Sequence, residues 1–140
     1  MCTEVLEKDM STVLRRYSSP FILFLLLSPG VQATEVDVLF SQELQDIQGK
    51  SGLMLTVTYA PGEAPGPHRH NAHTFVYVLE GSVVMQVEGG EAVTLSPGQT
   101  FYENPDDIHT VARNASDTEP AKILVFFVKE TDAPVTVPVE

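Results

Sequence analysis

The chain has 140 residues and a mass of 15.3 kDa, which suffices for one domain and leaves no room for a second core. Its formal net charge of −11 and its lack of any basic cluster argue against a nucleic-acid partner. The only cysteine is Cys2, near the N-terminus, so the sequence excludes a disulfide framework, a zinc–thiolate cluster and a cysteine nucleophile.

The first part of the chain has the pattern of a secretory signal peptide. Basic Arg15-Arg16 precede a short apolar run over residues 21–27, and a helix-breaking Pro29-Gly30 and a terminal Ala33 follow. The apolar run is too short for a permanent transmembrane helix. The sequence therefore predicts that residues 1–33 are removed, that the mature protein begins at Thr34 without a stable membrane anchor, and that it is exported to the periplasm or secreted.

The very start of the chain is less ordinary for such a peptide. Acidic residues precede the basic pair, and Met10 would be a more usual translation start. A buried N-terminal helix and an uncleaved anchor remain as alternatives. Twin-arginine export is a further alternative, although Tyr17-Ser18-Ser19 continues that pattern poorly.

From Thr34 onward the chain alternates between short β-forming stretches and turns. The Pro/Gly-rich residues 60–67 form a loop, and Glu80-Gly81 and Gly89-Gly90 are hairpin turn signals. Residues 41–48 are expected to form a short helical turn or a loop. The predicted strands cover residues 36–40, 52–59, 74–80, 82–88, 91–95, 99–103, 108–113, 121–128 and 135–137.

About nine short strands without a long helix predict a small all-β barrel or sandwich. The strand over residues 121–128 is the most apolar and should be central, and residues 135–137 should close an edge. Residues 75–79 and 123–128 are expected to be buried on both faces, with one face toward the barrel and the other against a second sheet or a partner chain. A homodimer is the corresponding prediction.

Three histidines are the main candidates for chemistry. His68 and His70 are separated by one residue in an extended stretch, so their side chains point the same way. Neutral imidazoles are ligands for transition metals, and His109 arrives from a later strand. The sequence predicts that the chain folds to bring His109 to this pair.

The same residues resemble the cupin family. Gly62, His68-Arg69-His70 and the stretch over residues 77–81 look like the first cupin motif. Gly98, Pro105, His109 and Asn114 look like the second. The resemblance covers roughly residues 50–130 and implies a double-stranded β-helix, or jelly roll, with a divalent metal inside. It implies that His68, His70 and His109 are the three histidine ligands.

One position departs from the family pattern. Thr74 stands where the family usually has a glutamate ligand, seven residues before Gly81. His73 could replace it if the strand begins with a bulge, or Glu103 could supply a carboxylate from the adjoining strand, or the position could be open to water and substrate. Glu103 and the open site are favoured over His73, and the open site would suit an anionic substrate.

Strand alternation gives an expectation for two arginines, and a surface position is the alternative for Arg113. Arg113 follows His109 by four residues, which predicts that it shares the histidine's face and could bind a substrate carboxylate or pair with Glu103. The same alternation predicts that Arg69 faces away from the site.

The sequence does not select one reaction. A three-histidine site accepts Fe, Mn, Ni, Cu or Zn. The leading hypothesis is a dioxygenase-type oxidoreductase acting on a small organic molecule. A sugar-acid isomerase or lyase using the metal as a Lewis acid, and a non-catalytic small-molecule or metal-binding module, are the alternatives.

Overall fold

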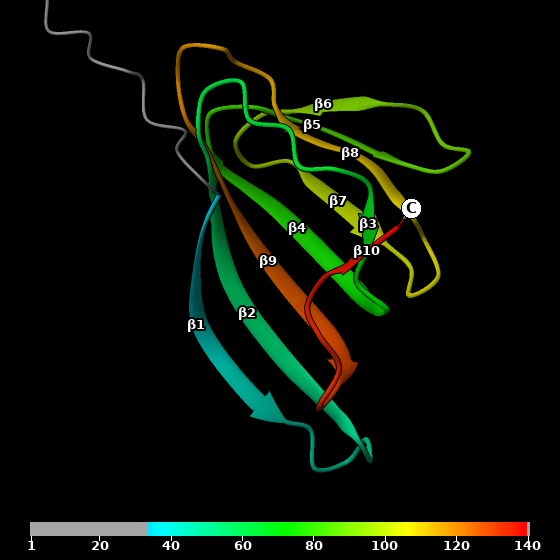
Figure 1. Cartoon of the computed structure of the whole chain (residues 1–140). Coiled ribbons are helices and arrows are strands. Elements are labelled where there is room, and N and C mark those ends of the chain that lie inside the picture. The colour runs from blue at the N-terminus through cyan, green and yellow to red at the C-terminus, as the bar shows by residue number, and fades with distance from the viewer. Residues whose placement is uncertain (1–33, 140) are drawn as a thin grey trace, which may run out of the picture. The chain divides into compact units, whose positions relative to one another are not determined.

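The computed structural model describes residues 34–139, so the predicted signal peptide lies outside the described part of the chain. Residues 34–139 form ten β-strands in two five-stranded antiparallel sheets (Figure 1). Within this range no helix is long and apolar enough to cross a membrane. The strands are β1 (Glu35–Glu43), β2 (Lys50–Tyr59), β3 (His68–Arg69), β4 (Ala72–Glu80), β5 (Val83–Val87), β6 (Val93–Leu95), β7 (Thr100–Glu103), β8 (His109–Asn114), β9 (Ala121–Glu130) and β10 (Val137–Pro138).

The first sheet has the strand order β1-β2-β9-β4-β7, and the second has the order β10-β3-β8-β5-β6. The all-β prediction is confirmed, and so is the central place of residues 121–128, since β9 lies between β2 and β4 (Figure 1). The predicted edge at residues 135–137 corresponds to β10, which is an edge strand of the second sheet and pairs with β3.

The core lies between the two sheets and is built by strand alternation. Leu55 of β2, Val76 of β4 and Val125 of β9 point inward from the first sheet, and Val83 and Met85 of β5 point inward from the second. Every second side chain of a strand reaches the same face, so a short alternating sequence is enough to fill such a core.

Two expectations for the first sheet are corrected by the structure. Residues 75–79 are not buried on both faces within this chain, because Phe75 and Tyr77 are 47% and 43% exposed on the outer face. The helical turn or loop expected over residues 41–48 begins later than predicted. Strand β1 has a bulge at Leu39 and continues to Glu43, which pairs with Ser51, and the turn occupies only residues 45–49.

Gly81 makes the tight turn after β4, with a φ of 68°. A Cβ at this position would lie 2.5 Å from the backbone oxygen of Pro120 and 2.8 Å from the Cα of Ala121. We expect Gly81→Ala to destabilise the fold by about 3 kcal/mol or more, because a left-handed backbone and a clash with backbone atoms add together. Urea unfolding followed by circular dichroism measures this loss.

Gly89→Ala is the matched control. Gly89 has a φ of 77°, yet a Cβ there meets no atom within 4 Å. Only the backbone strain applies, at about 1–2 kcal/mol. Equal losses for the two variants would contradict the clash at Gly81.

Candidate metal centre

The two strands that carry the histidines are neighbours in the second sheet. His68 of β3 and His109 of β8 are register partners, and His70 directly follows β3. Each of the three side chains offers one potential ligand atom, and these three atoms all lie within 4.8 Å of one another. The predicted meeting of His109 with the His68/His70 pair is therefore confirmed.

Backbone carbonyls hold two of the imidazoles in one tautomer. The Nδ1 atom of His68 lies 2.8 Å from the Gly66 oxygen, and that of His70 lies 2.6 Å from the Val135 oxygen. A carbonyl oxygen can only accept, so each Nδ1 carries the proton and each Nε2 keeps a free lone pair. This arrangement, with the far nitrogen hydrogen-bonded to the backbone, is typical of histidines that bind metals.

A buried carboxylate lies beside these imidazoles. Glu103 of β7 is only 2% exposed, and its Oε1 lies 3.3 Å from Nδ1 of His109, while its Oε2 lies 3.9 Å from Nε2 of His70. Its register partner on β4 is Thr74, which is 1% exposed. Glu103 therefore stands directly across the strand pair from the position at which the family pattern places its glutamate.

The polar atoms of this cluster fit a cation. Oε1 of Glu103 and both ring nitrogens of His109 are buried without a hydrogen-bond partner among the described residues. Buried polar groups in native proteins are nearly always paired, so several such atoms in one cluster call for an explanation. A divalent metal ion held by the imidazoles and the carboxylate supplies one.

Burial also shifts the acid–base properties of the two closest groups. It raises the pKa of Glu103 to about 7, with the Asp107 carboxylate contributing further. It lowers the pKa of His109 to about 4, with His68 and His70 contributing further. His109 is thus kept neutral, which is the form that binds metals.

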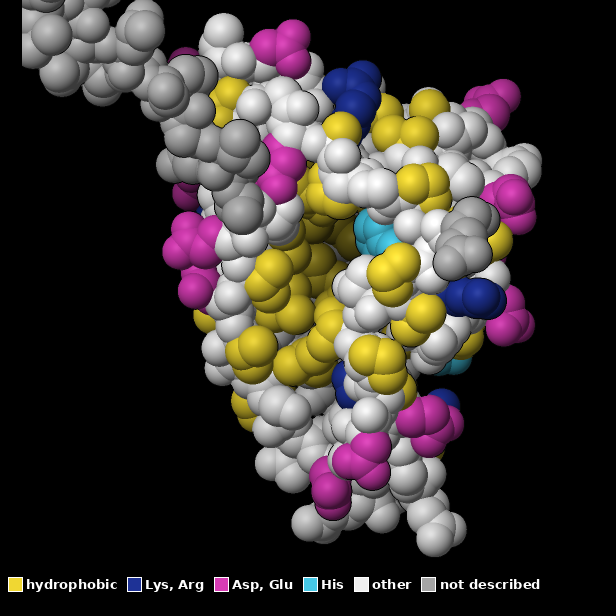
Figure 2. Space-filling model, viewed as in Figure 1, with side chains coloured by type: hydrophobic (Ala, Val, Ile, Leu, Met, Phe, Trp, Pro, Cys, Tyr) yellow, Lys and Arg dark blue, Asp and Glu magenta, His cyan; other side chains and the backbone are white. Residues whose placement is uncertain are grey.

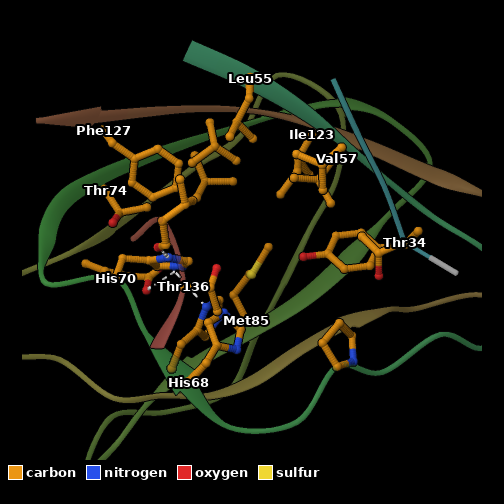
Figure 3. Close-up of a pocket in the computed structure, with 18 of the residues that line it drawn as sticks. Thr34, Leu55, Val57, His68, His70, Thr74, Met85, Ile123, Phe127 and Thr136 are labelled. Atoms are coloured by element: carbon orange, nitrogen blue, oxygen red, sulfur yellow. Dashed lines mark hydrogen bonds and ion pairs between the residues drawn. The ribbon is translucent and has the colours of Figure 1, made fainter. Parts of the chain in front are cut away.

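The histidines open into a cavity between the two sheets, with a volume of about 390 Å³. Figure 3 shows His68, His70 and Thr74 at one end, with Leu55 and Phe127 on the wall above them. The space-filling view shows an apolar hollow with a histidine at its margin (Figure 2). Further side chains of the two sheets line the cavity, and so do Thr34, β1, the Pro/Gly loop and the segment leading into β10.

The loop that carries His68 is fastened to the end of β8 by Asn114, which is 1% exposed. Its Nδ2 donates to the backbone oxygens of Ala60 at 3.0 Å and Glu119 at 2.8 Å, and its Oδ1 accepts from Ser116 N at 2.9 Å. The backbone N–H of Asn114 also donates to the Glu63 oxygen at 2.9 Å. The Pro/Gly loop is thereby held at a fixed distance from the strand that supplies His109.

The remaining predicted residues lie away from the cluster. His73 is exposed on the outer face of β4, where its Nδ1 lies 2.6 Å from the hydroxyl of Tyr102, so no bulge brings it inward. Arg69 is exposed, as alternation predicted.

The alternation argument for Arg113 is wrong. Strand β8 contains a bulge at Thr110, because Gln86 pairs with Val111 while Val87 pairs with His109. One extra residue reverses the facing of every later side chain. Arg113 is consequently exposed, donates to the Asn114 backbone oxygen at 3.0 Å, and is not among the residues that line the cavity.

Tyr59 also lines the cavity, although it is not among the residues predicted for the site. Burial raises the pKa of its hydroxyl far above the usual value, with the carboxylates of Glu103 and Glu63 contributing further, so the phenol is a neutral hydrogen-bond donor. The alternation of Leu55 and Val57 with Thr56 and Thr58 already places Tyr59 on the inward face of its strand.

These features define a class of protein: a two-sheet antiparallel β-fold with a histidine cluster suited to a metal at the end of an internal cavity. Residues 55–127 match the model of the Cupin domain family, and the chain belongs to this family. No protein with a curated description matches the sequence.

Solved structures share the double-stranded β-helix fold at low sequence identity. An uncharacterised conserved protein from Klebsiella pneumoniae superimposes with a TM-score of 0.60 and 19% identity, over 81% of this chain and 90% of that one. The DMSP lyase DddQ from Ruegeria pomeroyi has a TM-score of 0.55 and 21% identity, over 61% of this chain and 42% of that one. Oxalate oxidase in complex with the substrate analogue glycolate has a TM-score of 0.56 and 23% identity, over 74% of this chain and 54% of that one. This chain thus spans about half the length of the two enzymes.

Proposed function

We propose that this cupin is a metal-dependent enzyme that acts on a small organic molecule, with His68, His70 and His109 as ligands and Glu103 as the fourth. The observation that carries the proposal is the cluster itself. Two imidazoles present free Nε2 atoms fixed by backbone carbonyls, and the third imidazole and the carboxylate are buried with unpaired atoms beside them.

Within this function we favour a dioxygenase-type oxidoreductase. A bound redox-active ion would supply the binding and activation of dioxygen next to the substrate. The contribution of the chain is to hold the substrate at the imidazole end of the cavity. Apolar walls that include Val76, Val125 and Phe127 keep water away from that end.

A lyase or isomerase is the second candidate, and Glu103 is the observation that favours it. In this candidate Glu103 is not a ligand: its buried carboxyl group, with Oε1 3.3 Å from Nδ1 of His109, is the general base or acid beside the histidine site. The fold does not decide between the two, since a DMSP lyase and an oxalate oxidase share it with this chain.

Elemental analysis of protein purified from its own host, together with oxygen-uptake assays on candidate substrates, tests the proposal. A redox-active metal near one per chain with oxygen uptake supports the oxidoreductase. Turnover that persists without oxygen and is lost in Glu103→Gln supports the lyase or isomerase. Metal without any turnover would leave a binding module. No co-purified metal, and a His68→Ala/His109→Ala double variant with unchanged metal affinity, would overturn the whole proposal.

We also propose that two copies of the chain associate through the outer face of the first sheet. Phe75, Tyr77 and Tyr102 are all more than 40% exposed there, next to the half-buried Phe126. The lining of this patch includes no charged side chain. Two chains with a formal net charge of −11 can therefore meet there without placing like charges together.

Sedimentation velocity is expected to give a dimer for the wild type and a monomer for Tyr77→Glu, because the carboxylate would be desolvated in the contact. Thr94→Glu, at an exposed position of β6 in the second sheet, is the matched control and should remain dimeric. A monomeric wild type would contradict the prediction.

Export stays a prediction from residues 1–33. Mass spectrometry of the mature protein is expected to find Thr34 as the first residue. Detection of an intact Met1 or Met10 in the cytoplasmic fraction would refute it.

A further inference from the structure

The walls of the cavity differ sharply in chemistry from its histidine end. Side chains from both sheets form an apolar lining, and Figure 3 shows Leu55, Val57, Ile123 and Phe127 on one side with Met85 opposite. The metal-ligating atoms and Thr74 are confined to one end, and Thr34 lies at the other. A ligand in this space meets polar atoms mainly at one of its ends.

The cavity offers no cation to a second anionic group. Among the described residues, neither lysine nor arginine lines it, and its only acidic side chain is Glu103. Buried Lys129 donates its Nζ protons to the backbone oxygens of Glu130 and Thr131 and is not part of the lining. A dicarboxylate or sugar acid would place an unpaired charge against apolar walls, which is unfavourable.

Hydroxyl groups are the neutral donors of the lining, from the side chains of Tyr59, Thr34, Thr74 and Thr136. Tyr59 lines the cavity, and its phenol stays protonated because burial raises its pKa. Such a group can donate a single hydrogen bond to a neutral oxygen on the ligand. A water molecule takes up about 30 Å³ of the liquid, so a cavity of about 390 Å³ holds a molecule of roughly a dozen non-hydrogen atoms.

We propose that the substrate is a compact, mainly apolar molecule with a single oxygen-bearing head group and no second anionic group. The head lies at the imidazole end, and the apolar body lies along the wall formed by Leu55, Val57 and Val125. This inference rests on the proposed function, because the metal site is what holds the head. It narrows the anionic substrate that an open site would suit to a molecule with at most one anionic group, at the head.

Linear hydroxamic acids are suitable probes, since they share one metal-binding head and differ only in the alkyl body. Calorimetry on the Zn²⁺-loaded protein compares acetohydroxamic, butanohydroxamic and hexanohydroxamic acids, with oxalate as the dianionic probe. Affinity should rise about fourfold for each added methylene that enters the apolar wall. Oxalate should bind more weakly than hexanohydroxamic acid. NMR should detect contacts between the bound alkyl chain and the methyl groups of Leu55 and Val125.

Val57→Thr tests the wall without a change of side-chain size. This variant should keep its Zn²⁺ affinity. The ratio of its affinities for hexanohydroxamic and acetohydroxamic acid should be at least about threefold smaller than in the wild type, since a hydroxyl group now lies in the apolar wall. Val38→Thr, at a 64% exposed position of β1, is the matched control and should behave as the wild type.

The outcomes separate this inference from the metal site. Zn²⁺ binding with equal affinity for all three hydroxamic acids, or with tighter binding of oxalate, would overturn the substrate class and leave the metal centre standing. If Zn²⁺ does not bind, the proposed function fails. NMR titration of the metal-free protein with 1-butanol and 1-hexanol then tests the apolar preference of the cavity without the metal. Tighter binding of 1-hexanol with contacts to Leu55 supports the apolar preference, and equal or no binding overturns it.

Discussion

His109→Ala is expected to lower the affinity of the protein for Zn²⁺ by more than about 100-fold, since even the partners behind a ligand are worth 10–100-fold. His109 is 3% exposed and brings its ring to the other two imidazoles from a different strand. Among the described residues, no further histidine lies in the cluster to replace it. Competition calorimetry against a chelator of known affinity measures the loss.

The same variant should lose the stabilisation that the metal gives. At a free Zn²⁺ concentration of about 1,000 times Kd, binding stabilises a folded protein by about 4 kcal/mol. For a domain of this size that corresponds to a rise in Tm of about 15 °C. We expect this rise in the wild type and little of it in His109→Ala.

His73→Ala is the matched control, because it removes the same side chain from the exposed outer face of β4. It should keep both the affinity and the metal-dependent Tm. A similar loss in His73→Ala, or an unchanged affinity in His109→Ala, would show that the metal binds elsewhere.

Glu103→Thr is expected to lose about 10–100-fold in metal affinity, and the exchange of the two residues should recover most of that loss. Thr74 and Glu103 are register partners, and both face the interior. Their Cα atoms are therefore about 4.5–5.5 Å apart. A carboxylate carried by β4 in Thr74→Glu/Glu103→Thr can reach the same imidazoles. We expect the double variant to bind within about tenfold of the wild type.

Thr74→Glu alone separates charge from position. This variant places two carboxyl groups side by side in the interior, and like charges at such a distance resist ionisation together. It should be less stable than the double variant in the metal-free form, as urea unfolding would measure. If the double variant binds no better than Glu103→Thr, Glu103 has a structural role and the site depends on the three histidines.

Much of the fold follows from local patterns. The alternation in β2 and β9 and the glycines of the hairpin turns are local sequence patterns, so the positions of these strands and turns could be predicted. The meeting of His109 with His68 could also be predicted, because the resemblance to the two cupin motifs implies that these histidines bind one metal.

The remaining features depend on register between strands. The bulge at Thr110 is set by pairing with β5, and alternation counted along β8 alone placed Arg113 on the wrong face. The position of Glu103 opposite Thr74 is likewise a property of the β4–β7 pair. The exposure of Phe75 could not be predicted either, since an apolar run has the same sequence whether its outer face meets a sheet of its own chain or another molecule.

Asn114 has a practical consequence for producing this protein. Asn114-Ala115-Ser116 is an acceptor sequence for N-linked sugars. In the folded chain the acceptor nitrogen, Nδ2, is buried and donates to backbone oxygens. A glycan could be attached only before folding, and it would then occupy the space of those hydrogen bonds. Expression through a eukaryotic secretory pathway should therefore yield either an unglycosylated barrel or a glycosylated chain that cannot close it, whereas a bacterial host avoids the conflict.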